Sequence, residues 1–156
     1  MHAPAPMQLY DTSWGEVTAF APGETVTMYV CGITPYDATH LGHAATYVTY
    51  DVLQRRLIDR GHRVRYVRNI TDVDDDIIRA ARQRDVHYLD LAFGEIVRFD
   101  GDMAALNTLP PWSEPRATGA IGNIRGLIDT LLTQGDAYLV DGAVYFDTGA
   151  ANGFGS

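Results

Sequence analysis

The clearest pattern in the chain is a short apolar run followed by a helical period. Residues 26–30 are apolar or β-branched and predict a buried strand. From His43 to about Arg60, apolar residues recur at the i, i+4 spacing of a helix, with Gly61 placed to end it. Residues 63–71 predict a second strand, parallel to the first across a β–α–β crossover. The pattern therefore predicts an α/β fold with a parallel sheet.

Two strand pairs are expected beside this unit. Residues 9–11 and 17–20 predict a small pair that braces the edge of the sheet. Residues 137–140 and 143–146, joined by Asp141-Gly142, give the strongest hairpin pattern in the chain.

Two further helices are predicted, one over about 87–107 and one that runs through 121–131 and stops at Gly135. Periodicity also assigns a face to each long helix. The residues expected to lie on the apolar side are Ala44, Val48, Val52, Leu53 and Leu57 in the first helix and Leu89, Phe93, Ile96, Met103 and Leu106 in the second.

Composition narrows the functional classes. With 156 residues, of which 46% are hydrophobic, the chain is long enough for one globular domain with a core. A formal net charge of −8 argues against a general surface for polyanions, although local arginines remain available to RNA. One cysteine excludes an internal disulfide, and no run approaches the ~20 apolar residues of a membrane span. Without a secretion pattern at its start, the chain is expected to be cytoplasmic, with no membrane partner.

Candidate chemistry gathers where the first strand gives way to the helix. His40 and His43 bracket Gly42, whose missing side chain lets a flat ring or a phosphate approach the backbone. The following helix points its unpaired N–H groups at the same place, which favours an anion. On residue type and spacing alone, a helix cap and a surface histidine are an equally good interpretation.

An acidic run follows the second strand. Asp72, Asp74, Asp75 and Asp76 are oxygen ligands of the kind that a hard cation prefers. Carboxylates also favour the first turn of a helix, and residues 77–81 have a helical pattern. Helix capping is therefore the favoured interpretation, and a metal site the alternative.

The segment His40-Leu41-Gly42-His43 resembles the His-x-Gly-His motif of class I aminoacyl-tRNA synthetases. Together with residues 28–34 and 66–75, it resembles the cysteinyl-tRNA synthetases and their relative, the mycothiol-pathway ligase that joins cysteine to glucosaminyl-inositol. The resemblance runs from about Leu9 to the last residue, and it is far more specific than one four-residue motif.

The resemblance implies the N-terminal half of a Rossmann-like class I synthetase catalytic domain, with a parallel sheet and a helical and hairpin insertion. It divides the chain into a loose tail at 1–8, the first half of the nucleotide-binding domain at 9–108, and the start of the inserted connective subdomain at 109–156. The second lysine-containing motif of such enzymes cannot lie in this chain, because all 12 of its Lys and Arg residues are arginines.

The resemblance also implies a reaction, in which the carboxylate of cysteine attacks the α-phosphate of ATP, bound with Mg²⁺. His40 and His43 would be the catalytic donors to the phosphate oxygens. The implied ATP-binding residues are His40, Leu41, Gly42 and His43, and the implied cysteinyl-adenylate-binding residues are Cys31, Gly32, Ile33, Thr34, Thr46, Asn69, Ile70 and Thr71.

Cys31 matches the first Zn²⁺ ligand of these enzymes, in which the zinc ion coordinates the thiolate of the substrate. Seen without the resemblance, it is a small residue at a strand end. The other three ligands of the family would lie beyond the end of this chain, so the zinc site is expected to be incomplete here.

Three functions stay open. The chain resembles the tRNA synthetase slightly more in residues such as Arg68 and 114–118, which makes tRNA the favoured acceptor. Residues 34–39 and 43–47 instead favour the mycothiol-pathway ligase, with glucosaminyl-inositol as acceptor. The third possibility is a truncated, non-catalytic paralogue that binds ATP and cysteine, or a half-enzyme whose missing half-site comes from another chain.

Overall fold

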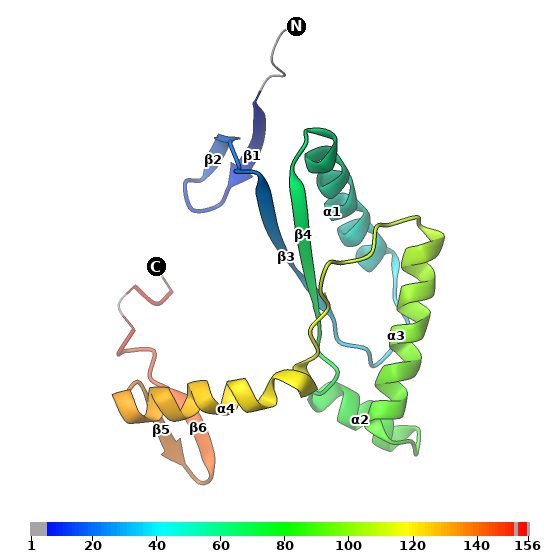
Figure 1. The fold of residues 1–156 in the computed structure, drawn as a ribbon. Coiled ribbons are helices and arrows are strands. Elements are labelled where there is room, and N and C mark those ends of the chain that lie inside the picture. The colour runs from blue at the N-terminus through cyan, green and yellow to red at the C-terminus, as the bar shows by residue number, and fades with distance from the viewer. Residues whose placement is uncertain (1–5, 152, 156) are drawn as a thin grey trace, which may run out of the picture.

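A parallel strand pair crossed by one helix forms the centre of the molecule. The structure, a computed structural model, describes residues 6–151 and 153–155. Strand β3 (Thr25–Ile33) pairs in parallel with β4 (Arg63–Ile70), and helix α1 (Leu41–Asp59) connects them (Figure 1). The predicted β–α–β unit is therefore confirmed, and the helix starts two residues earlier than expected.

The first hairpin stands apart from this pair. Strands β1 (Met7–Asp11) and β2 (Glu16–Phe20) are antiparallel, as predicted, but they form a two-stranded sheet of their own (Figure 1). The expectation that they brace the edge of the central sheet is wrong, since neither strand pairs with β3 or β4. Strand β1 also begins inside the expected loose tail, whose residues 1–5 lie outside the described part of the chain.

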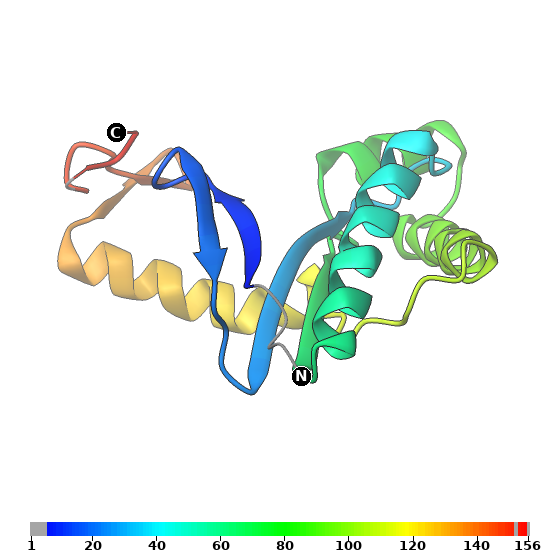
Figure 2. The same ribbon diagram turned by 90° about the horizontal axis from the view of Figure 1, so that it is seen from above.

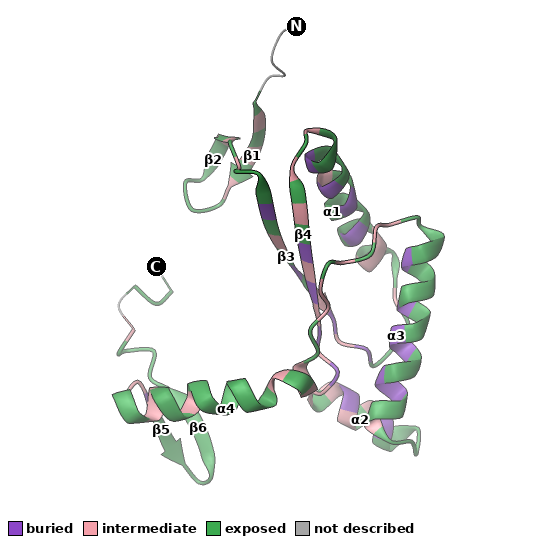
Figure 3. Ribbon diagram, in the orientation of Figure 1, coloured by how far each residue is buried: buried purple, intermediate pink, exposed green. Residues whose placement is uncertain are grey.

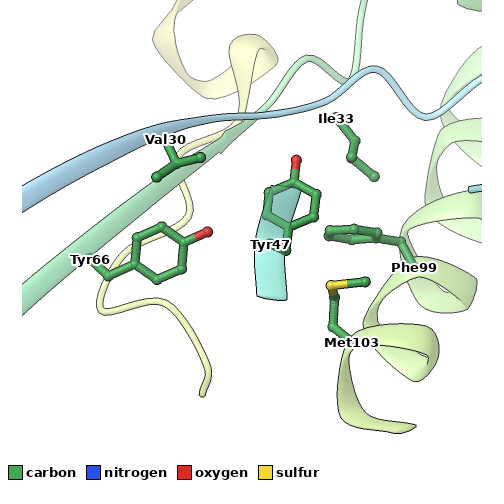
Figure 4. Packing of buried hydrophobic residues seen from close by; sticks show 6 residues of the cluster. All are labelled: Val30, Ile33, Tyr47, Tyr66, Phe99 and Met103. Carbon is green, nitrogen blue, oxygen red and sulfur yellow. The ribbon is translucent and has the colours of Figure 1, made fainter. Parts of the chain in front are cut away.

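Helices cover one side of the central pair. Helices α2 (Asp75–Gln83) and α3 (Tyr88–Ala105) follow β4, and α3 lies with α1 on the same side of the strands (Figure 2). The core between them is built from aromatic and aliphatic side chains of four elements, β3, α1, β4 and α3 (Figure 4). Its buried members are Val30, Ile33, Tyr47, Tyr66, Phe99 and Met103.

The inward face of α1 differs from the expected one. Tyr47, Asp51, Gln54 and Leu57 are buried, whereas Val52 is 61% exposed (Figure 3). Asp51 can occupy an inward position because its carboxylate accepts hydrogen bonds from the backbone N–H of Leu109 and from Arg55, at 2.7 and 2.6 Å.

The face of α3 is shifted in the same way. Ile96 and Met103 are buried as expected, but Leu89, Phe93 and Leu106 are exposed. The face that the structure buries comprises Leu91, Ala92, Glu95, Ile96, Phe99 and Met103. Glu95 is tolerated there because Arg98 donates to its Oε1 at 3.0 Å.

An extended segment lies along the outer edge of β4. Val67 bridges to Ser113 and Ile70 bridges to Arg116, both in parallel. Arg68 fixes this segment, because its buried guanidinium donates to Glu114 at 2.6 Å and lies 4.4 Å from the ring centroid of Phe99. The segment that was expected to open the insertion therefore begins by packing on the first unit.

The final elements project to the other side of β3 and β4. Helix α4 (Ala117–Gln134) leads into the hairpin of β5 (Ala137–Val140) and β6 (Ala143–Phe146), which confirms both predictions (Figures 1 and 2). The helix ends at Gly135, whose φ of 83° suits glycine, and the hairpin turns through Asp141 and Gly142, both at positive φ. Within the described residues, no helix is long and apolar enough to cross a membrane.

Breaking the buried ion pair should test how the 112–116 segment is held. Arg68→Met leaves Glu114 without its cation, and we expect the free energy of unfolding to fall by about 3 kcal/mol in a urea titration. The matched control is Arg63→Met, because Arg63 pairs with Glu24 in an exposed position and should matter by less than about 0.5 kcal/mol. Equal losses in the two variants would contradict the structural role of Arg68.

Candidate functional site

The carboxyl ends of β3 and β4 meet where the sequence places its candidate residues. The backbone N–H of Gly32 donates to Asn69 Oδ1 at 2.9 Å, and the backbone N–H of Thr71 donates to the carbonyl of Ile33 at 2.9 Å. The expectation that residues 31–34 lie across from 69–71 is confirmed. Ligands of open parallel sheets bind at such strand ends.

Gly32 lies against the backbone of the opposite strand, with no room for a side chain. A Cβ added there would lie 1.4 Å from the carbonyl oxygen of Asn69, inside any possible van der Waals contact. Only glycine can therefore occupy this position.

The side chain of Asn69 forms hydrogen bonds with residues of β3 and with Thr71, which follows β4. Its Oδ1 accepts hydrogen bonds from Gly32 N–H and from the Tyr29 hydroxyl, at 2.9 and 3.0 Å, and its Nδ2 donates to Thr71 Oγ1 at 3.2 Å. These bonds hold both strand ends in register. Tyr29 was not singled out from the sequence, although it stands two residues before Cys31 and so shares its face of the strand.

Cys31 is exposed at the end of β3. Its carbonyl accepts a hydrogen bond from the Tyr47 hydroxyl at 3.2 Å, and burial raises the pKa of that hydroxyl to about 12, so it stays a donor at neutral pH. Within the described residues, no group of three or more His, Cys, Asp or Glu side chains is arranged to hold a metal ion. The residues present thus offer zinc one sulfur and do not form a zinc site.

The two histidines form a capping box at the start of α1. His40 is the N-cap, and its Nδ1 accepts from the backbone N–H of Gly42 at 3.1 Å, while His43 Nδ1 accepts from the backbone N–H of His40 at 3.3 Å. The interpretation as a helix cap is therefore correct for His40, and His43 also takes part in the cap, where a surface histidine was the expectation. The cap also fixes the tautomers of both rings, because an Nδ1 that accepts leaves the proton of a neutral imidazole on Nε2, where it can donate to a ligand.

The charge state of His43 agrees with this geometry. Burial lowers the pKa of His43, and the neighbouring His40, whose ring centroid is 4.1 Å away, lowers it further. Gly42 accommodates the pair, since a Cβ there would lie 2.8 Å from the His40 ring. The site thus presents a neutral imidazole next to a helix N-terminus.

A hollow of about 370 Å³ opens in front of these groups. It brings together five of the candidate residues and adds three from the connecting loop. Its lining is Gly32, Ile33, Thr34, Tyr36, Asp37, Ala38, His40 and His43.

The other candidate residues lie around the hollow without lining it. Thr46 Oγ1 donates to the Gly42 carbonyl at 3.0 Å, Ile70 is fully buried in the core, and Leu41, 87% exposed, lines an apolar hollow on another side of His40. Asn69 and Thr71 are joined to each other by a hydrogen bond at the end of β4, and Cys31 lies on the opposite face of β3 from the core residue Val30.

Two side chains of the connecting loop over 34–39 contact the helices that follow β4. Asp37 pairs with Arg84, at the end of α2, at 3.4 Å, and Thr39 Oγ1 donates to Asp102 on α3 at 2.5 Å. Two helices therefore hold the loop that forms the wall of the hollow.

The acidic run caps two different helices. Asp74 is the N-cap of α2 and accepts from the backbone N–H groups of Asp76 and Ile77, which confirms the capping interpretation. Asp72, buried, instead accepts from the backbone N–H and hydroxyl of Thr118, at 2.9 and 2.6 Å, and so caps α4. Sequence reasoning missed this second role because the partner lies 46 residues away.

A parallel β–α–β unit with donor groups at the strand ends and at the helix N-terminus is the arrangement typical of Rossmann-like α/β domains. The model of the class I (C) tRNA synthetase catalytic domains matches residues 18–156. The chain belongs to this family, which confirms the resemblance seen in its motifs.

Curated relatives share about half of the residues. The chain is 50% identical over 152 residues to an L-cysteine:1D-myo-inositol 2-amino-2-deoxy-α-D-glucopyranoside ligase of Mycobacterium ulcerans, and 49% identical over 149 residues to the ligase of the same name from Parafrankia. Each alignment covers 96% of this chain, but only 37% and 34% of the relative. The chain thus spans about a third of the length of these proteins.

Solved structures agree on the fold. A Mycobacterium tuberculosis methionyl-tRNA synthetase in complex with methionyl-adenylate matches with a TM-score of 0.61 and 24% identity, over 77% of this chain and 28% of that one. An Agrobacterium radiobacter LeuRS in a ternary complex matches with a TM-score of 0.62 and 23% identity, over 76% of this chain and 15% of that one. At these identities the likeness shows the Rossmann-like fold.

Gly32→Ala tests the close approach of the strand ends. Because the new methyl group would overlap the Asn69 carbonyl, we expect a loss of about 3 kcal/mol or more in the free energy of unfolding, or failure to fold. Gly122→Ala on α4 is the control, since a Cβ there meets nothing within 4 Å and alanine favours a helix. A well-folded Gly32→Ala protein of normal stability would contradict the geometry.

His40→Asn tests the electrostatics of the capping box. Asparagine is a good N-cap but carries no charge, so the pKa of His43 should rise while staying below its ordinary value, because burial, the larger cause, remains. Histidine NMR titration measures the change. In the unaltered chain the lowered pKa means that protonation of His43 opposes folding. Its contribution to the free energy of unfolding is therefore fully present above pH ~6.5 and is lost as the pH falls. A pKa for His43 that does not move would exclude the contact with His40 as a cause.

Proposed function

We propose that this chain supplies the nucleotide- and cysteine-binding part of an ATP-dependent ligase. The observation that carries the proposal is the pair of histidines that cap α1. Each uses Nδ1 for the cap and has Nε2–H left as a donor, beside the hollow that Gly32 helps to line. The family implies ATP with Mg²⁺ as substrate, and the names of the curated relatives imply cysteine as the amino acid.

The first step requires little covalent work from the protein. A carboxylate oxygen of cysteine bonds to the α-phosphorus of ATP, the bond from that phosphorus to its bridging oxygen breaks, and pyrophosphate leaves with Mg²⁺. His40 and His43 donate through Nε2–H to the phosphate oxygens as negative charge builds there. The N-terminus of α1 adds its dipole, and Gly42 leaves room for the adenine.

The remaining candidate residues shape the amino-acid side of the site. The backbone around Gly32 and Thr34 contacts the adenylate, and Asn69 and Thr71 hold that backbone in place. Cys31 is the zinc ligand that this chain would provide, with further ligands supplied from outside it. Zinc favours sulfur, so a metal there would select cysteine over serine.

The second step transfers the cysteinyl group to an amine. We favour the amine of an amino sugar joined to inositol, because the curated relatives at about 50% identity are named for that acceptor. Its nitrogen bonds to the carbonyl carbon, the bond from that carbon to the phosphate oxygen breaks, AMP leaves, and the nitrogen gives up a proton. The family description favours a second acceptor, the terminal hydroxyl of tRNA.

A chimaera tests the proposal. This chain replaces the matched region of the Mycobacterium ulcerans relative, and cysteine-dependent ATP–pyrophosphate exchange is measured with serine as the control substrate. We expect exchange with cysteine that falls about 10- to 1000-fold in His43→Asn. His62→Asn is the matched control, because His62 stands before β4 at the far end from the hollow, and it should retain exchange.

The acceptor is read in the same chimaera and in the intact relative. Release of AMP on addition of glucosaminyl-inositol supports the favoured acceptor, whereas release only on addition of tRNA transfers the proposal to the tRNA ligase. If the relative is active and the chimaera folds but shows no exchange, the chain is a binding paralogue and the ligase proposal is wrong.

A further inference from the structure

A second, polar hollow adjoins the candidate nucleotide hollow. It measures about 280 Å³, close to the lower end of the ~300–1,000 Å³ of small-molecule sites. The two hollows share Tyr36 and Asp37, so a molecule in one reaches the border of the other. The second is lined by Tyr36, Asp37, Asp76, Arg79, Ala80, Gln83 and Arg84.

The chemistry of this lining suits a neutral polyhydroxyl compound. Two carboxylates and two guanidiniums give it a formal charge of zero, so it offers no net attraction to a phosphate or an RNA backbone. Its carboxylates accept hydrogen bonds, its guanidiniums donate them, and Gln83 does both, which matches hydroxyl groups that do both as well. Tyr36, 42% exposed, adds an apolar ring face at the border.

Arg84 is held in place before any ligand arrives. Its guanidinium pairs with Asp37 from the connecting loop at 3.4 Å and with Glu95 from α3 at 3.7 Å. Glu95 is buried, and its Oε2 has no hydrogen-bond partner among the described residues. Two carboxylates from different elements therefore orient one planar donor at the wall of the hollow.

We propose that this second hollow is the acceptor site, which binds the amino sugar–inositol next to the adenylate. The inference rests on the proposed function, because it takes the acceptor from the same ligase reaction. Arg84 and Gln83 bind hydroxyl groups of the acceptor, and Asp37, at the border, accepts a hydrogen bond from its amine. The amine then lies on the side of the nucleotide hollow, where the cysteinyl group is made.

Titration of the ¹⁵N-labelled chain by NMR tests the site without any turnover. Glucosaminyl-inositol should shift the backbone amides of Tyr36, Gln83 and Arg84, and glucosamine and myo-inositol separately should shift subsets of them. Arg84→Gln and Gln83→Ala should each weaken binding by about tenfold or more. Gln83 takes part in none of the ion pairs that hold the loop, so its variant tests contact with ligand without loss of those pairs. Arg125→Gln, exposed on α4, is the matched control and should bind normally.

Other outcomes overturn the inference. Shifts confined to other elements, an unchanged affinity in both variants, or no binding at millimolar concentration each exclude this hollow as the acceptor site. Shifts of the same amides by tRNA but not by the amino sugar assign the surface to RNA and contradict the proposal. A parallel titration with ATP keeps the two proposals apart. If ATP shifts the amides of His40 and His43 but the amino sugar shifts nothing, only the acceptor site is wrong. If ATP does not shift these amides, the result counts against the nucleotide site.

Discussion

The close contact between the backbones at Gly32 and Asn69 is the constraint on which the rest of the site depends. It brings the ends of two parallel strands together with no room for a side chain, and the Asn69 amide then bonds to the strand opposite. The direction in which β3 leaves this contact determines where the loop over 34–39 runs. That loop in turn places His40 at the N-cap of α1. A change of one methyl group at the strand end is thus felt at the imidazoles.

The histidines show how one set of side chains can serve both structure and chemistry. A serine or aspartate would also cap α1, but an ionised aspartate has no hydrogen to donate, and the serine donor sits on the same short-reaching oxygen that accepts from the backbone. An imidazole caps with one nitrogen and keeps the other, which is protonated in the neutral ring. The lowered pKa of His43 protects this arrangement, because a proton on Nδ1 would end its bond to the His40 backbone.

The elements of the fold could be predicted because each has a local cause: β-branched runs, apolar periods, and glycines at turns. The inward faces of α1 and α3 could not, because Asp51 and Glu95 occupy buried positions that hydropathy assigns to solvent. Both are tolerated through bonds to distant or neighbouring groups. The candidate site was found largely through its motifs, whereas Tyr29, Tyr47 and Asp72 act through partners that no spacing along the chain reveals.

The cap that Asp72 places on α4 has a mechanical meaning. Asp72 follows directly after Thr71, at the strand end, and its two bonds to Thr118 fasten the first turn of a helix whose 18 residues project away from the core (Figure 1). A helix that is fixed at its first turn and free along the rest of its length moves as one rigid unit about that turn. Any force on the far end of α4, or on the hairpin beyond it, is delivered as torque to the residues that hold the strand ends in register.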